Sequence, residues 1–195
     1  MPTTSESNGG TPARILDAAE RIVQVRGFNA FSYGDIADEL RITTAALHYH
    51  FPRKAELGKA LIARYSARFG QRLRALDAQG GAARAKLDGY VALYADVLRQ
   101  GRMCMCGVLA AEIGTLSAGM QDAVRGFFDQ NESWLARVLE EGSAEGSMRL
   151  PGPVTDAARM IIAGLEGAML LAMTYDDVER FTTVAGELLA SLYRS

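Results

Sequence analysis

Two cysteines separated by a single residue are the most chemically distinctive feature of the chain. Cys104 and Cys106 alternate with methionines and follow Arg102, whose positive charge could lower a thiol pKa and make the thiolate more reactive. At this spacing the two thiols do not form a disulfide framework, and without a nearby histidine they do not make a metal site. Buried and inert thiols are the alternative that we favour, because free cysteine is among the most buried residue types.

A second distinctive run extends from Thr43 to Lys54. Hydroxyl and imidazole groups suit phosphate oxygens and base edges, and a small alanine lets a helix approach closely. On a short helix, Ala46 and Leu47 would anchor the inner side. A short polar helix of this kind is suited to a DNA major groove about 12 Å wide. The outer side would carry Thr43, Thr44, Ala45, His48 and Tyr49.

Aromatic, methionine and cysteine side chains are concentrated between residues 90 and 134. Such side chains suit an adaptable apolar pocket, with ordinary core packing as the alternative for each of them. We expect ligand contacts from Tyr90, Tyr94, Cys104, Cys106, Phe127 and Trp134. Further candidates for the cavity lining are Val97, Met103, Leu109, Phe128 and Met173.

Two glutamates, Glu112 and Glu166, lie alone on apolar helices and could contact a ligand. No acid, base or nucleophile accompanies them in a pattern that indicates catalysis. The sequence therefore predicts no catalytic residues, no enzyme activity, no metal site and no cofactor.

The elements that must position these residues are all helical. Apolar residues recur at helical spacing, and no window alternates with the period of a strand. We expect Thr11 to cap the first helix, with Pro12 at its first position and Gly27 after its end. Three short helices should be followed by about six longer ones. The expected ranges are 11–26, 32–40, 43–50, 54–78, 82–100, 103–116, 118–141, 154–174 and 177–193.

The second and third short helices, joined by a tight link beneath the first, match a helix-turn-helix. Ser32 and Asp35 have the spacing of a capping box, and Thr43 can cap the third helix. The sequence thus predicts an all-α chain in three parts. These are a mobile tail (1–10), a helix-turn-helix DNA-binding domain (11–56) and a helical ligand-binding and dimerisation domain (57–195).

The residues of this region also carry a family resemblance. Three stretches have the residue types and spacing of the family's motif. They are Gly27-Phe28, the run from Phe31 to Leu40, and the run from Ile42 to Leu57 with its Phe-Pro pair. Together they resemble the DNA-binding domain of TetR-family transcriptional regulators, densely over about residues 12–60. The resemblance implies a dimeric repressor that reads a palindromic operator with its N-terminal domains and binds a small inducer in its C-terminal domain.

Residue roles follow from the same resemblance. By position, Tyr49 and Lys54 are similar to residues that contact phosphate. The base-facing positions correspond to Thr44, Ala45 and His48, and the remaining backbone contacts correspond to Tyr33 and Thr43.

The last two helices are the expected dimer interface, as they are in proteins of the TetR type. Small residues four positions apart between Ala163 and Leu171 permit close approach of helices. Packing within one subunit is the alternative. The interface residues that we expect are Gly164, Ala168, Leu171, Leu188 and Leu192.

Charge is distributed unevenly along the chain of 195 residues. Residues 1–76 carry eleven Lys and Arg against seven Asp and Glu, a net of +4. Residues 77–195 carry ten against sixteen, a net of −6. The basic part coincides with the helix-turn-helix, which favours a DNA partner there, whereas the acidic part favours an apolar or aromatic inducer over a polyanion.

The N-terminus has neither the basic nor the apolar region of a secretory signal, and we expect no apolar run to approach the roughly 20 residues of a membrane span. We therefore expect a cytoplasmic protein without a membrane partner. The alternative function is a redox- or electrophile-sensing repressor that acts through Cys104 and Cys106.

Overall fold

The structure, a computed structural model, describes residues 10–193. Within this range the chain is helical, with one isolated β-bridge between Met148 and Tyr193. The all-α class is therefore confirmed. Its elements are α1 (Thr11–Arg26), α2 (Tyr33–Leu40), α3 (Thr44–His50), α4 (Lys54–Gln79), α5 (Ala83–Leu98), α6 (Met105–Ala111), the 3-10 turn η1 (Ile113–Thr115), α7 (Ala118–Ala144), α8 (Val154–Tyr175) and α9 (Val178–Ala190).

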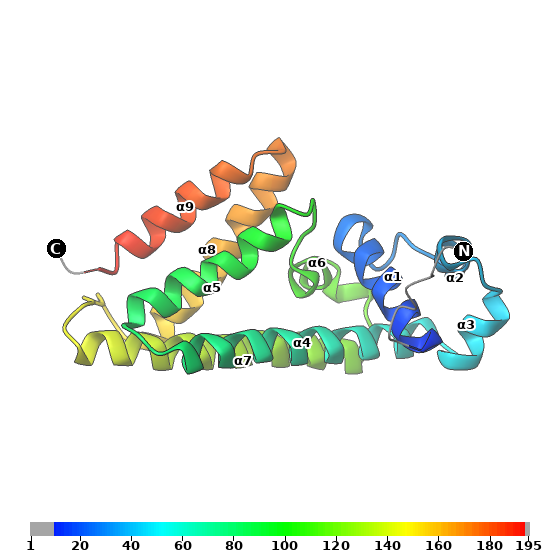
Figure 1. Cartoon of the computed structure of the whole chain (residues 1–195), viewed down its shortest axis with the longest axis horizontal. Coiled ribbons are helices and arrows are strands. Elements are labelled where there is room, and N and C mark those ends of the chain that lie inside the picture. Colours follow the sequence, from blue (N-terminus) through cyan, green and yellow to red (C-terminus); the bar gives the residue numbers. More distant parts are fainter. Residues whose placement is uncertain (1–9, 194–195) are drawn as a thin grey trace, which may run out of the picture.

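The molecule is elongated, with α1, α2 and α3 gathered at one end (Figure 1). The long helix α4 leads away from this end beside α7, and α5, α8 and α9 cover the other part of the bundle (Figure 1). The domain boundary expected between residues 56 and 57 falls inside α4, which continues through it without a break. A movement within the bundle can therefore be transmitted to the N-terminal helices through α4.

The short helices begin where the sequence predicts. The Ser32 side chain accepts the Asp35 N–H, and the Asp35 carboxylate accepts the Ser32 N–H at 2.7 Å, which completes the capping box. Hydrogen bonds from Ser32, followed by one from Arg26, lower the pKa of Asp35. Thr43 accepts the Ala46 N–H at 3.2 Å and caps α3 as expected.

The start of α1 differs from the expectation. Gly10 occupies the capping position and provides no side-chain hydrogen bond, so Thr11 lies inside the helix. Pro12 is in the first turn, where its missing N–H leaves no carbonyl unpaired. Of the tail expected over residues 1–10, only Gly10 belongs to the described residues.

Helix α8 corrects the expectation that no apolar run is long enough to span a membrane. It has 22 residues, and its most apolar stretch reaches a mean hydropathy of 1.4, so length and composition alone would allow a span. The reason is that both of its sides are apolar. One side packs against α7 and α9, and the other exposes Met160, Leu170 and Leu171.

Candidate DNA-binding helix and ligand pocket

Helix α3 presents a polar outer side to solvent. Leu47 is fully buried beneath it and fixes the helix against the core. Tyr49 is 82% exposed, the largest exposure among the aromatic residues described as exposed. Hydroxyl, imidazole and phenol groups are thus available together on this side of the helix. The five exposed residues are Thr43, Thr44, Ala45, His48 and Tyr49.

Tyr33 and Lys54 are placed differently from the expectation. The Tyr33 hydroxyl donates a hydrogen bond to the Phe51 carbonyl at 2.7 Å, and its ring is buried beside His48. The Lys54 ammonium donates to the Phe31 carbonyl and lies 4.2 Å from the centre of the Phe31 ring. Both polar groups are bonded inside the protein: Tyr33 joins α2 to the end of α3, and Lys54 joins the start of α4 to the link before α2.

The six residues expected to contact a ligand form packed core instead of lining a cavity. Tyr90 stacks on Trp134 with ring centres 5.5 Å apart, and its hydroxyl donates to Asn131 at 3.0 Å. The Trp134 indole N–H donates to Asp77 at 3.1 Å. The aromatic side chains fill the space between α4, α5 and α7 against one another. None of the six lines either of the two pockets described below: Tyr90, Tyr94, Cys104, Cys106, Phe127 and Trp134.

The two thiols are buried and unreactive in this conformation. Cys104 and Cys106 are free cysteines with no more than 2% exposure. Burial raises the pKa of both thiols well above the ordinary value, and the nearby carboxylate of Glu166 raises it further. The pKa shift is thus opposite to the one expected from the neighbouring Arg102. The thiolate, which is the reactive form, is disfavoured.

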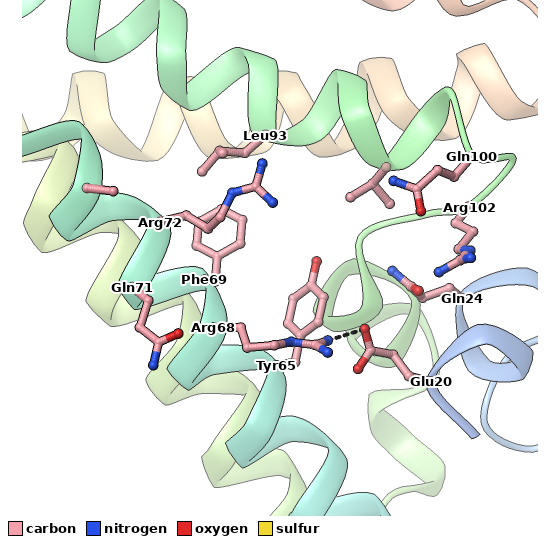
Figure 2. A pocket seen from close by; sticks show the side chains of 12 residues that line it. Glu20, Gln24, Tyr65, Arg68, Phe69, Gln71, Arg72, Leu93, Gln100 and Arg102 are labelled. Carbon is pink, nitrogen blue, oxygen red and sulfur yellow. Dashed lines mark hydrogen bonds and ion pairs between the residues drawn. The ribbon is translucent and has the colours of Figure 1, made fainter. Parts of the chain in front are cut away.

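A first pocket, of about 530 Å³, lies between α1, α4 and α5. Figure 2 shows Arg68 reaching Glu20 across its floor, with the rings of Tyr65 and Phe69 beside it. Arg72 and Arg102 belong to a lining in which polar and apolar side chains are mixed. The pocket lies between the N-terminal helices and the bundle. Two of its arginines are partly neutralised by ion pairs, Arg68 with Glu20 and Arg72 with Asp96.

A second pocket is larger, about 920 Å³, and its lining is mostly apolar. We call it the α6 pocket. Three helices of the bundle and the end of α1 form its walls. Its lining includes Gln24, Val25 and Arg26 of α1 with the following Gly27, Met103, Gly107, Val108, Ala110, Ala111 and Glu112 of the α6 region, Phe128 and Glu132 of α7, and Arg159, Ile162, Ala163, Glu166, Gly167 and Leu170 of α8.

Hydrogen bonds connect this pocket wall to the DNA-binding end of the molecule. Gln24 Nε2 donates to the Met103 carbonyl at 3.0 Å, and the Met103 N–H donates to the Gln24 carbonyl at 3.2 Å. The Glu112 carboxylate accepts the backbone N–H groups of Phe28 and Asn29. The segment that lines the pocket therefore holds the link between α1 and α2.

Most of the residues expected at a dimer interface pack inside one subunit. A Cβ on Gly164 would lie 2.8 Å from Leu188 of the same chain, and Ala168 and Leu192 are buried. Leu171, by contrast, is 50% exposed. The exposed apolar surface of α8 and α9 comprises Met160, Leu170, Leu171, Tyr175 and Val184.

Sequence reasoning found part of the α6 pocket and missed the rest. Met103 and Phe128 belonged to the wider set of candidates, and Glu112 and Glu166 were singled out as isolated carboxylates. The stretch Gln24–Gly27 was missed, because it lies far away in the sequence. Its signal was a polar side chain, Gln24, on the apolar face of the first helix, where it is buried.

Comparison with known proteins identifies the family. Residues 15–61 match the family described as bacterial regulatory proteins, tetR family, and residues 77–187 match the tetracyclin repressor-like C-terminal domain. These matches span most of the chain. The chain therefore belongs to the TetR family of transcriptional regulators, and its DNA-binding part is the helix-turn-helix formed by α2 and α3.

Individual relatives agree. The transcriptional regulator AcuR of Cereibacter sphaeroides is 26% identical over 177 residues, covering 83% of this chain and 77% of that protein. The repressor NemR of Escherichia coli is 26% identical over 168 residues, with 83% of both chains covered. A TetR-family regulator from Agrobacterium tumefaciens has a TM-score of 0.91 and 29% identity, covering 94% of this chain and 97% of that one. These relatives are DNA-binding regulators of bacteria, a family whose members typically form homodimers and respond to small molecules.

Proposed function

We propose that this protein is a dimeric repressor that binds a palindromic DNA operator through α3 and releases it when a small apolar or aromatic ligand occupies the α6 pocket. The observation that carries the proposal is that one pocket is walled both by the bundle and by residues Gln24–Gly27 of α1. A ligand there touches the ligand-binding part and the DNA-binding part at once. Repression, in preference to activation, is supported by the relative NemR, which is named a repressor.

DNA recognition in this proposal uses the exposed side of α3. Thr44, Ala45 and His48 face the bases, and Tyr49 and Thr43 contact the phosphate backbone. Tyr33 and Lys54 position the helix through their bonds to the Phe51 and Phe31 carbonyls. The DNA partner puts the protein in the cytoplasm, and no enzymatic step is involved.

Dimerisation in this proposal uses the exposed apolar side of α8 together with Val184 of α9. Two recognition helices must be about 34–36 Å apart to read successive half-sites of an operator. A ligand can change this separation only if it binds one arrangement of the dimer better than the other. Occupancy of the α6 pocket would do so by moving α6 relative to α1, because Met103 and Glu112, which flank α6, are hydrogen-bonded to Gln24 of α1 and to Phe28 just after it.

The test combines an operator with a blocked pocket. Binding to DNA from upstream of the protein's own gene is measured by fluorescence anisotropy, and ligands are found by thermal-shift screening. Ala111→Phe places a large ring at an exposed position of the pocket wall, whereas Ala118→Phe places the same ring at an exposed position outside it. We expect Ala111→Phe alone to abolish release by the ligand while operator binding stays intact. Equal release in both variants would contradict the assignment of the pocket.

Sensing through Cys104 and Cys106 is the alternative, and it requires the thiols to become exposed. Their burial and raised pKa favour reversible occupancy of the pocket over covalent modification. The double substitution of serine for both cysteines retains size and removes the thiol chemistry. Loss of the response to the ligand in this double variant, with folding retained, would support the thiol mechanism.

A further inference from the structure

One carboxylate in the α6 pocket is paired with no cation in the part of the chain that the structure describes. Glu166 lies midway along α8, and its Oε1 is buried without a hydrogen-bond partner. Its other oxygen lies against Gly107 of α6, where any Cβ would overlap it. The absence of a side chain at residue 107 therefore leaves the space in which the carboxylate sits. Both residues line the pocket.

The other charged groups of the pocket already have partners. Arg159 pairs with Glu132 at 3.5 Å and with Asp156 at 3.2 Å, and Arg26 pairs with Asp35 at 3.0 Å. The Glu112 carboxylate accepts two backbone N–H groups. Among residues 10–193, no lysine, arginine or histidine forms an ion pair with Glu166. Its charge is thus the one that a ligand could neutralise.

The surroundings of Glu166 make a bare negative charge unfavourable. Burial raises its pKa to about 7, and hydrogen bonding from the Cys104 thiol and the Tyr94 hydroxyl offsets this only in part. A carboxylate removed from water is stabilised strongly by a positive charge at hydrogen-bond distance. The rest of the lining, including Met103, Val108 and Phe128, offers apolar contact to the body of a ligand.

We propose that the α6 pocket takes an organic cation, a protonated amine or quaternary ammonium on an apolar or aromatic body, and that Glu166 is its counter-ion. This inference rests on the proposed function and specifies the chemical class of the inducer. The apolar walls bind the body of the ligand, and Glu166 selects its head group. The pocket volume of about 920 Å³ suits a drug-sized molecule.

Three probes with one body and different heads test the selection. We would measure binding of 4-phenylbutylamine, 4-phenylbutanol and 4-phenylbutyrate by calorimetry at about pH 8, above the raised pKa of Glu166. We expect the amine to bind about tenfold more tightly than the alcohol, and the carboxylate to bind most weakly. Glu166→Gln should remove the advantage of the amine. Glu132→Gln is the matched control, because it removes a paired carboxylate from the same pocket.

Each outcome decides the matter. Equal affinity of the amine and the alcohol for the unmodified protein overturns the proposal, as does failure of all three probes to bind. An amine preference that survives Glu166→Gln assigns the selection to another group and also overturns it. Should Glu166→Gln fail to fold, Gly107→Ala replaces it: the added methyl displaces the carboxylate, and we expect the amine preference to fall.

Failure of the proposed function has a different signature. Calorimetry needs no DNA, so the amine preference is measured whether or not the pocket controls the operator. If the amine binds through Glu166 but leaves operator binding unchanged, the site is a cation site and the induction mechanism is wrong. If the alcohol binds as well as the amine and releases the operator, induction is right and the role of Glu166 is wrong.

Discussion

Glu112 Oε2 accepts a hydrogen bond from the Phe28 backbone N–H at 2.8 Å, although 84 residues separate them in the sequence. The same carboxylate accepts the Asn29 N–H, and the Asn29 side chain donates to Thr115 at 2.7 Å. One side chain thus holds the link between α1 and α2 against the segment after α6. The α6 pocket ends at this residue, so the link can respond to its occupancy.

The first prediction is that Glu112→Ala weakens this connection. Two backbone N–H groups lose their acceptor, and we expect the free energy of unfolding to fall by about 1–3 kcal/mol. The effect of ligand on operator affinity should shrink as well, because the pocket wall no longer holds the link. Urea unfolding and anisotropy titrations measure the two effects. Glu140→Ala, an exposed glutamate on α7, is the control.

The second prediction compares one chemical change at two tyrosines. Tyr33→Phe removes the hydroxyl bonded to the Phe51 carbonyl, and we expect a loss of about 1 kcal/mol in stability. Tyr49→Phe removes an exposed hydroxyl and should leave stability unchanged. It should instead weaken binding to operator and random DNA alike, with the salt dependence unchanged because the hydroxyl carries no charge. The reverse pattern in these two variants would contradict the assigned roles.

The third prediction concerns sequence preference. Thr44→Ala and His48→Ala remove groups from the outer side of α3, and each should cost about 1–3 kcal/mol on the operator while changing which bases are preferred. Binding to random DNA should be nearly unaffected. A selection experiment on randomised operator DNA measures the change. A uniform loss on all sequences would mean that these residues contact phosphate only.

The fourth prediction distinguishes two glycines three positions apart on α8. Gly164→Leu forces a side chain onto Leu188 of the same subunit, so we expect a loss of about 1–3 kcal/mol in stability. Gly167 has no atom within 4 Å of a Cβ position and is exposed. Gly167→Leu should therefore preserve the fold and shift the protein from dimer toward monomer. Light scattering and thermal unfolding separate the two results. An unchanged dimer in Gly167→Leu would move the interface elsewhere.

The fifth prediction concerns pH. The folded protein holds the proton of Glu166 up to about pH 7, whereas an unfolded glutamate releases it near 4.5. The folded state therefore binds more protons in this interval, and stability falls as the pH rises through it. Since one pKa unit corresponds to about 1.4 kcal/mol, the full loss is about 3 kcal/mol. Glu166→Gln should flatten this part of the stability curve, measured by denaturant unfolding between about pH 5 and 8. A slope that persists in the variant would mean that another group titrates.

Local features of the fold could be predicted because they depend on neighbours in the sequence. The Ser32–Asp35 capping box and the Thr43 cap involve residues three positions apart, and both form as expected. The division of α3 into an inner side with Leu47 and an exposed outer side follows from helical periodicity. The domain boundary expected at residue 56 has no local signal of this kind, because α4 is regular on both sides of it.

The pocket could not be predicted, for a physical reason. Aromatic composition is the same whether the rings line a cavity or fill it, and here Tyr90, Phe127 and Trp134 fill it. The actual cavity joins Gln24 to Glu166, which are far apart in the sequence and come together only because α1 packs against α6, whose Gly107 lies against Glu166. Gly164 has a similar ambiguity: a small residue permits close approach of any helix, and the neighbour that the structure shows is α9 of the same chain.

Ala163, Gly167 and Leu170 have two roles in the proposed dimer, because they are exposed on α8 and also form the rim of the α6 pocket. A ligand and a second subunit then meet the same atoms, so their binding free energies are linked and each alters the affinity of the other by the same factor. The ligand concentration that releases the operator would depend on how much of the protein the cell contains. A cell could thus tune the threshold of its response through the expression level of the regulator alone.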